Sequence, residues 1–335
     1  MKITATAATR VDLAGGTLDL HPLFLFLDNP LTVNASINLR SRAVVAPLPG
    51  TKVRLISEDL GETVEADNPE ELELGRELDL LKRAVRFYAP GGGLELRTFS
   101  SAPKGSGLGA SSSLLMSMSA ALGRFSGRDD GIDDIIHWGG ALEAQNLRIP
   151  TGLQDYYGAC LGGINGLRFG VDGASISTLH PSDEFSGQLQ EAMIVSFTGV
   201  SHFSGTNNWN MLKGFIDRQG DVPERMEAIR DIAQEMWEGL LEEDLQAVAK
   251  ALDAEWQQRC GLAEGVTTAA IDAMMAAARQ AGALASKLCG AGGGGCMLTL
   301  AAPGRRAEVC AALRGAGAQI LEVSLDKTGL SVQEE

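Results

Sequence analysis

The chain is short of positive charge: 28 lysine and arginine residues stand against 43 aspartate and glutamate residues, and the net charge is −15 at pH 7. Nucleic acids and anionic membranes attract basic surfaces, so this balance argues against both as the main partner. Much of the acidity lies in residues 58–79, where ten acids accompany one arginine. We interpret that run as a solvated face without a chemical role.

Cysteine is also scarce, and long apolar runs are absent from the start of the chain. The five cysteines are an odd number without a paired metal-binding spacing, which predicts free thiols and a cytoplasmic protein. No basic stretch followed by an apolar core precedes residue 30, so we expect no signal peptide. The apolar run 23–27 is far too short to span a bilayer.

The length of 335 residues and the apolar content of 44% allow sizeable cores and predict two domains that share a cleft. The chain changes character near residues 180–190. We therefore place the division between residues 1–188 and 189–335. No internal repeat is evident.

The segment 103–113 is rich in glycine and serine, and it lies between an alternating run at 94–99, typical of a strand, and an apolar run at 114–122, typical of a helix. Glycines at 105, 107 and 109 permit positive φ angles and close approach of a ligand. The serines fall at the helix start, where free N–H groups and the helix dipole hold phosphate and a hydroxyl can cap the helix or ligate a metal. The segment predicts a polyphosphate site.

Other interpretations of this segment stay open from the sequence. A flexible linker, or a capped helix without a ligand, has the same composition. No Gly-Lys-Ser/Thr closes a Walker A loop. A loose Rossmann pattern ends at Ala110, but Asp129 and Asp130 follow no evident strand, which disfavours a dinucleotide site. A nucleotide kinase with another loop is also possible.

Two acids follow the serine-rich segment. Glu143 lies on a predicted helix at 132–147, which ends before Pro150, and Asp155 follows a glycine turn. Magnesium-dependent phosphoryl transfer needs one acid to help hold Mg²⁺ and another to accept a hydroxyl proton. The alternative is a pair of unrelated surface acids, which spacing alone does not exclude.

Near the start, a strand at 2–13 runs into Gly15 and Gly16, with Asp19 three residues later. Such a turn can direct a side chain into a cleft, or it can be a tight hairpin with a solvated carboxylate. Residues 32–37 and 42–46 then predict paired strands, 52–56 another strand, and 78–88 a helix.

In the second half, residues 192–198 predict a strand followed by a polar loop at 199–209 that contains His202. Amphipathic helices are expected at 226–240 and 245–256. A third glycine-rich segment, 287–296, is expected between a helix at 268–281 and a strand at 297–300. It matches G-x-G-x-x-G in the reverse context of a dinucleotide loop, so we expect its glycines to meet another chain segment or a phosphate.

Three ordered segments, 10–19, 103–113 and 287–296, with an acid pair between the last two, resemble the GHMP kinases over nearly the whole chain. Within that family the chain looks most similar to the sugar 1-kinases, especially the heptose 7-phosphate kinases, and more distantly to the fucokinases. The likeness rests on Leu13-Ala14-Gly15-Gly16, Asn34-Ala35-Ser36-Ile37, Gly105-Ser106-Gly107-Leu108-Gly109, Gln154-Asp155-Tyr156 and Gly162-Gly163-Ile164-Asn165.

The resemblance implies an α+β fold of two domains, an N-terminal ATP-binding domain with a left-handed βαβ crossover and a ferredoxin-like C-terminal domain. It implies ATP and Mg²⁺, a catalytic Asp155 beside Arg10, and Ser111 and Glu143 at the metal. The ATP-binding residues would be Pro103, Lys104, Gly105, Ser106, Gly107, Leu108, Gly109, Ala110, Ser111, Ser112 and Ser113. The acceptor would contact Gly16, Thr17, Asp19, His202, Gly292 and Gly293.

The expected activity is transfer of the ATP γ-phosphoryl group to a hydroxyl, most simply the anomeric one, of a sugar or sugar phosphate. His202 lies where several heptose-phosphate kinases carry an arginine, and imidazole is a poorer partner for phosphate, so an unphosphorylated sugar is also open. Ala110 replaces a family serine but leaves Ser111 and Ser112. The alternatives are an ATP-dependent decarboxylase of the diphosphomevalonate type and a non-catalytic binding protein. The sequence leaves the oligomeric state undetermined.

Overall fold

The structure, a computed structural model, describes residues 1–201 and 204–335. Its larger sheet has the strand order β12-β1-β2-β5-β3-β4, with β6 joined to β2 and β7 to β6. Strands β3 and β5 run parallel, and the other pairs run antiparallel. The strands are β1 Ile3–Ala14, β2 Leu31–Leu48, β3 Val53–Ser57, β4 Glu62–Ala66, β5 Gly93–Ser100, β6 Ile164–Gly170, β7 Gly173–Leu179 and β12 Ser331–Glu334.

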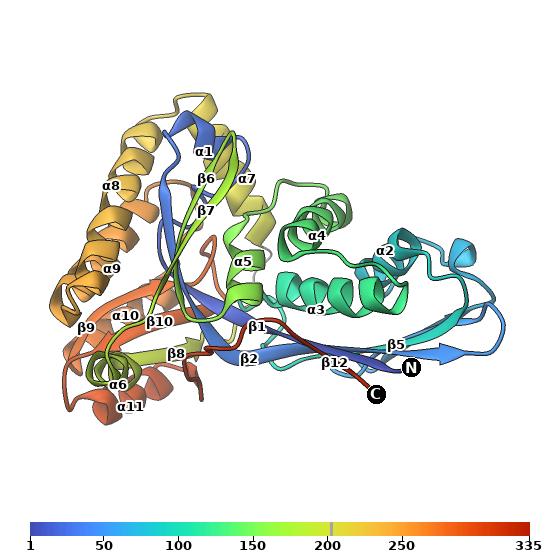
Figure 1. Cartoon of the computed structure of the whole chain (residues 1–335). Helices are drawn as coiled ribbons and strands as arrows, with labels where there is room; N and C mark the ends of the chain where they lie inside the picture. Colours follow the sequence, from blue (N-terminus) through green and yellow to red (C-terminus); the bar gives the residue numbers. More distant parts are fainter. Residues whose placement is uncertain (202–203) are drawn as a thin grey trace.

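A layer of helices covers one face of this sheet: α2 Asp79–Tyr88, α3 Ala110–Phe125, α4 Ile132–Leu147 and α5 Gln154–Leu161 (Figure 1). Helix α3 is buried along most of its length, including Leu115, Met116 and Met118. Its burial removes apolar surface from water on the sheet side and on the side of the other helices. The start of α3 is thereby fixed directly after Gly109, the last glycine of the segment 103–113.

The smaller sheet has the order β11-β8-β10-β9, with every neighbouring pair antiparallel. Taken along the chain this is strand order 4-1-3-2, that of a ferredoxin-like fold, so the expected α+β class is confirmed. Its strands are β8 Met193–Phe197, β9 Ala283–Leu288, β10 Cys296–Ala301 and β11 Gln319–Leu321. The helices of this half are α6 Asp183–Ala192, α7 Ser204–Ile216, α8 Val222–Leu241, α9 Leu245–Arg259, α10 Ala269–Gln280 and α11 Arg306–Gly315. Two short helices, α1 Leu23–Phe26 and the 3₁₀ helix η1 Pro69–Glu71, lie in the first half.

Three expectations about elements are wrong. Residues 32–37 and 42–46 are not two paired strands but parts of the single strand β2. The polar segment 199–209 is not a loop throughout, because α7 begins at Ser204. The third glycine segment follows the strand β9 rather than a helix, and it connects β9 to β10 as a hairpin. The predicted helix at 132–147 matches α4.

The core is continuous between the two halves. One cluster joins Val11 and Val33 of the larger sheet to Val195 and Leu298 of the smaller one. Residue 188, our predicted division, lies inside α6, and the division stays a prediction. At the far end of the chain, β12 pairs with β1, which brings the two termini together (Figure 1).

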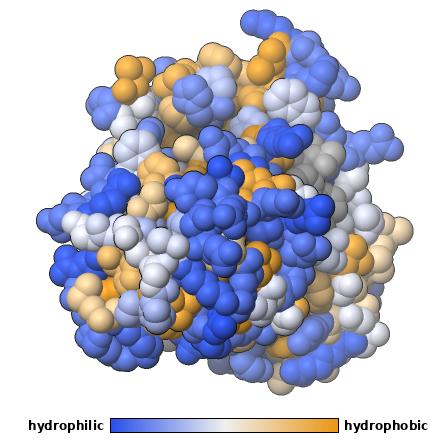
Figure 2. Space-filling model, turned by 90° about the vertical axis from the view of Figure 1, so that its right-hand side faces the viewer, coloured by the Kyte–Doolittle hydropathy of each residue, from blue (hydrophilic) through white to orange (hydrophobic). Residues whose placement is uncertain are grey.

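The acidic run 58–79 lies mainly in β4, η1 and their connections, and most of its charged side chains are exposed. The side of the molecule that faces right in Figure 1 is largely hydrophilic, with small, separate apolar patches (Figure 2). Among the helices within 1–201 and 204–335, none has the length and apolar character needed to cross a membrane.

Candidate active site

A cleft of about 440 Å³ contains most of the residues that the sequence singled out. Its walls include Arg10 from β1, the Gly16–Asp19 turn, the glycine-rich segment before α3, and Asp155 at the start of α5. Asn208 of α7 and Gly290 and Ala291 of the third glycine segment close it from the second half. At its far end lie Asp59 and Asp79, so the acidic run, which we expected to be only solvated, also contributes to the cleft.

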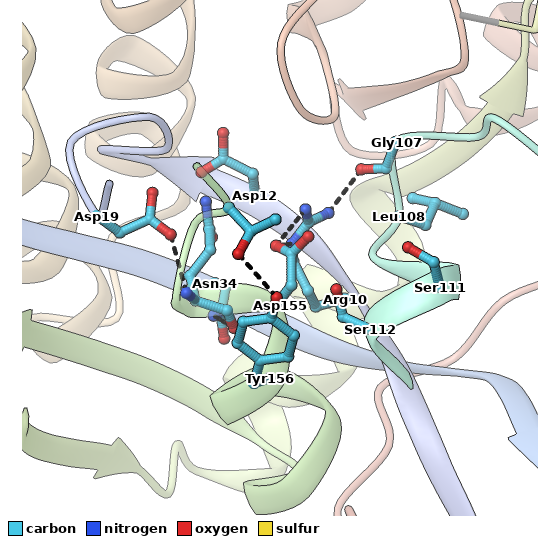
Figure 3. A network of polar contacts seen from close by, with 12 residues as sticks. Arg10, Asp12, Asp19, Asn34, Gly107, Leu108, Ser111, Ser112, Asp155 and Tyr156 are labelled. Carbon is cyan, nitrogen blue, oxygen red and sulfur yellow. Dashed lines mark hydrogen bonds and ion pairs between the residues drawn. The ribbon is translucent and has the colours of Figure 1, made fainter. Parts of the chain in front are cut away.

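Arg10 links Asp155 to the glycine-rich segment 103–113 (Figure 3). It is only 3% exposed, and its Nε and Nη2 lie 2.8 and 2.5 Å from Oδ1 of Asp155. Its Nη1 donates to the carbonyl of Gly107 at 2.6 Å. Burial alone would lower the pKa of Arg10, but the Asp155 carboxylate raises it above its ordinary value. Because both guanidinium bonds end on Oδ1, the other carboxylate oxygen receives neither of them.

The second glycine-rich segment (103–113) and the third (287–296) pack against each other through their main chains. A Cβ on Gly107, where φ is +71°, would lie 1.9 Å from the carbonyl oxygen of Cys289. A Cβ on Gly295 would lie 2.7 Å from the carbonyl oxygen of Ser106, which also accepts the N–H of Cys296 at 2.6 Å. The close neighbour expected for the third segment is therefore the main chain of the second.

Glu143 lies on α4 beneath the start of α3. It is 3% exposed and accepts hydrogen bonds from the hydroxyls of Ser111, Ser112 (2.8 Å) and Tyr156 (2.7 Å). Burial raises the pKa of Glu143, although these three hydroxyls oppose the rise. Ser111 also reaches the cleft. The serine and the acid thus form a pair of oxygen groups at the helix start.

Asp19 lies on the opposite side of the cleft from the serines (Figure 3). Its Oδ2 accepts the N–H of Gln154 at 2.8 Å, and a Cβ on Gly152 would lie 2.4 Å from the same oxygen. Burial raises the pKa of Asp19 to about 6. Asp19 is therefore a buried carboxylate of the cleft wall and not a solvated turn residue.

Several predicted site residues lie elsewhere. Ser113 is buried and donates to the carbonyl of Ala7, and Leu108 belongs to the core. Pro103, Ser112, Ser113 and the predicted metal residue Glu143 do not line the cleft, and neither do Gly292 and Gly293. The last two lie at Val266: the N–H of Gly293 donates to its carbonyl, and a Cβ on Gly292 would lie 2.5 Å from that oxygen. His202 lies outside the described residues.

Sequence reasoning missed a buried group of charges beside the site: Asp12, Glu255, Arg259 and Lys287. Each of these residues stands out locally in the sequence. Asp12 and Arg10 interrupt an apolar strand at alternate positions, and Lys287 is the first residue of the third glycine-rich segment. Glu255 and Arg259 are spaced by one helical turn. Nothing in the sequence joins the four.

Comparisons with known proteins identify the family. The model "GHMP kinases N terminal domain" matches residues 79–163, and "GHMP kinases C terminal" matches residues 236–319. The D-glycero-alpha-D-manno-heptose 7-phosphate kinase of Campylobacter jejuni is 27% identical over 327 residues, covering 96% of each chain. The mevalonate kinase of Methanothermobacter thermautotrophicus is 27% identical over 269 residues, covering 79% of this chain and 82% of its own.

Solved structures agree in fold. A D-glycero-D-manno-heptose 1-phosphate kinase from Bacteriodes thetaiotaomicron has a TM-score of 0.81 at 23% identity, with 99% of each chain covered. The Lactococcus lactis galactokinase complexed with galactose has a TM-score of 0.76 at 17% identity, covering 100% of this chain and 95% of its own. The two matched models together span about half of the sequence. The chain therefore belongs to the GHMP kinases, and it is a phosphotransferase.

Proposed function

We propose that this chain transfers the γ-phosphoryl group of ATP to a hydroxyl of a sugar or a sugar phosphate such as a heptose 7-phosphate. Within that acceptor we assign the anomeric hydroxyl as the one phosphorylated. The name of the Campylobacter jejuni relative supports a heptose phosphate as acceptor. The observation that carries the proposal is the position of Asp155. Its carboxylate is held by Arg10 directly beside Gly109, where α3 begins.

The phosphates of ATP are assigned to the main chain of residues 105–112. Gly105, Gly107 and Gly109 have φ angles of +69°, +71° and +70° and line the cleft, where main chain without a Cβ lets a phosphate approach closely. The N-terminus of the 16-residue helix α3 adds its unpaired N–H groups and its dipole. Lys104, also in the wall, supplies a positive charge.

Mg²⁺ is assigned to Ser111 and Glu143. The described residues contain no group of three or more His, Cys, Asp or Glu side chains that could hold a metal. Magnesium suits this arrangement, because it usually takes one or two protein oxygens and completes its shell with phosphate oxygens and water. When bound, it would offset the charge of the transferred group. The hydroxyls of Ser112 and Tyr156 fix the orientation of the Glu143 carboxylate.

Asp155 is assigned the role of orienting the acceptor hydroxyl and taking its proton on the carboxylate oxygen that Arg10 leaves free. Arg10 holds this carboxylate in position through the hydrogen bonds from its Nε and Nη2 to Oδ1. Gly16, Thr17 and Asp19 line the cleft on the acceptor side, and carboxylates there can accept hydrogen bonds from sugar hydroxyls. Gly290 and Ala291 take the place in the wall that we expected for Gly292 and Gly293.

A phosphotransfer screen tests the proposal. The purified chain with ATP and Mg²⁺ is offered heptose 7-phosphate, heptose, fucose, galactose, mannose, mevalonate and diphosphomevalonate. The product is examined by NMR to locate the new phosphate. We expect phosphorylation of at least one sugar at its anomeric oxygen. Activity on mevalonate alone, or release of CO₂ from a diphosphomevalonate, would overturn the assignment of a sugar acceptor.

A further inference from the structure

Four charged side chains form a closed cluster beside the acceptor end of the cleft: Asp12, Glu255, Arg259 and Lys287, here called the charge cluster. Each of these side chains is 0% exposed. Lys287 Nζ lies 2.7 Å from Asp12 Oδ2 and 3.1 Å from Glu255 Oε2. Arg259 pairs with Glu255 and lies 3.7 Å from Asp12 Oδ2. Two negative and two positive groups balance one another.

The charge cluster joins distant parts of the chain. Asp12 comes from β1, Glu255 and Arg259 from α9, and Lys287 from β9. Burial would raise the pKa of Asp12, but the cations of Lys287 and Arg259 hold it below its ordinary value. Buried ion pairs give little stability compared with apolar packing of the same shape, because each ion loses its hydration. Fold stability alone therefore does not account for the cluster.

One member of the cluster reaches beyond it to the acceptor turn. Arg259 donates from Nη2 to the carbonyl of Gly16 at 2.7 Å and from Nη1 to Thr17 Oγ1 at 3.1 Å. Thr17 has a φ of 76°, in the left-handed region that is unfavourable for a β-branched residue. The two terminal nitrogens of the Arg259 guanidinium thus bind the main chain and a side chain of this turn, at the residue where its backbone is strained.

The acceptor turn, Gly16 to Asp19, also contacts α7. The hydroxyl of Thr17 donates to Asn208 Oδ1 at 3.2 Å, while it accepts from Arg259. Because the oxygen of the Asn208 amide is engaged with Thr17, its two N–H donors point away from Thr17. Asn208 and Thr17 both line the cleft. A row of contacts therefore runs from the buried cations to two groups of the acceptor wall.

We infer that Arg259 is a positioning residue for the acceptor: it fixes the turn from Gly16 to Asp19 so that Thr17, Asn208 and Asp19 present their polar groups to the sugar hydroxyls. This inference rests on the proposed function. An arginine is needed because its planar fork donates in two directions while it stays paired with Glu255. A lysine keeps the charge, but all of its N–H donors are on one nitrogen atom.

The first test compares Arg259→Lys with Arg279→Lys, a control at an exposed arginine that pairs with Asp253 and does not line the cleft. For Arg259→Lys we expect KM for the sugar to rise about tenfold or more, as for the loss of a charged hydrogen bond, while KM for ATP changes by less than about twofold. The control should leave both values unchanged. Equal changes in both KM values, or only a fall in kcat, would show a merely structural role.

A second pair of variants covers the case in which Arg259→Lys fails to fold. Thr17→Val removes the hydroxyl that Arg259 binds and keeps the shape, whereas Thr17→Ser keeps the hydroxyl. We expect the valine variant to raise KM for the sugar and the serine variant to rescue it. If Arg259 acts through Thr17, combining Arg259→Lys with Thr17→Val adds little to the larger single effect. Additive effects contradict the inference.

Hydrogen exchange separates this inference from the proposed function. Amides of the segment 13–20 should exchange faster in Arg259→Lys than in the wild type, and those of 103–113 should not. This measurement needs no acceptor. A wild-type protein inactive on every sugar refutes the proposed function alone, whereas unchanged exchange at 13–20 refutes the positioning role alone.

Discussion

At the scale of single residues, the carboxylate of Asp155 is the group whose chemistry can be tested most directly. Asp155→Asn keeps the size of the side chain and an oxygen that can accept from Arg10, but it removes the proton acceptor. We expect kcat to fall by roughly 10²- to 10⁴-fold, with nucleotide affinity nearly unchanged. Steady-state kinetics and nucleotide titration measure the two effects. A variant with near-normal kcat would rule out proton transfer to this side chain.

Asp19 gives a prediction about pH. Its pKa is raised to about 6 by burial, above the ordinary 3.8, so the folded protein binds its proton more tightly than the unfolded chain does. Asp19 therefore favours folding fully below about pH 4, and this contribution is lost as the pH rises to 6. We expect Asp19→Asn to gain stability relative to the wild type across that interval, by on the order of 3 kcal/mol.

Chemical denaturation at pH 4, 5, 6 and 7 measures this difference. Asp172→Asn, the same substitution at an exposed position, serves as the matched control. A flat difference for Asp19→Asn would mean that the carboxylate is well solvated in the folded protein, and it would remove the support for a buried acceptor-side acid.

Residue types in the site were predictable because a family pattern fixes them, but most of their hydrogen-bond partners were not. The contact between Arg10 and Asp155 followed from the resemblance, and the structure contains it. Two other hydrogen bonds could not be predicted, because nothing in the sequence indicates them. They run from the Tyr156 hydroxyl to Glu143 and from the Arg259 guanidinium to the carbonyl of Gly16. Such contacts depend on how far a side chain reaches in the folded protein, which sequence spacing does not encode.

At the scale of elements, the contact between the second and third glycine-rich segments predicts how a substitution at Gly107 changes stability. Gly107→Ala places a Cβ 1.9 Å from a backbone oxygen of Cys289 and imposes a φ of +71° on alanine. The main chain of Cys289 belongs to a packed loop and cannot move aside as a flexible side chain can. We expect a loss of at least 3 kcal/mol, about 1 kcal/mol of it from the left-handed backbone, together with weaker nucleotide binding.

Gly127→Ala isolates the backbone part of that loss. Gly127 has a φ of +72°, and a Cβ added there would meet no atom within 4 Å, so the variant carries the same conformational strain without the clash. Denaturant unfolding of both variants gives the comparison. If Gly107→Ala is no less stable than Gly127→Ala, the two segments are not in contact as described.

Elements were predicted best where local pattern and tertiary environment agree, as in α4. Strand β2 was divided in error because its middle is polar. Asn38 there exchanges hydrogen bonds with Ser324, and Arg40 binds Asp326 and the carbonyl of Gly329. These partners lie more than 280 residues away along the chain. A polar stretch satisfied by so distant a segment is indistinguishable from a turn in the sequence.

At the scale of the whole molecule, the cleft depends on both halves of the chain. Its walls come from residues as far apart as Arg10 and Ala291, and the underlying core is shared by both sheets. A ligand in the cleft therefore touches elements whose positions are set by one continuous core. Binding should stabilise the fold as a unit rather than one half of it.

This coupling gives a prediction about ligand and metal removal. A nucleotide at 100 times its Kd should stabilise the protein by about 2.7 kcal/mol, because it binds the folded state only. With ATP held at one concentration, chelation of Mg²⁺ should lower Tm, since Ser111 and Glu143 would lose their share of the complex. Glu143→Gln should have a Tm with ATP that no longer responds to Mg²⁺, while ATP alone still stabilises it. If Glu143→Gln keeps the full response to Mg²⁺, the metal is held by groups other than Glu143, and the assignment of this carboxylate to the metal is wrong.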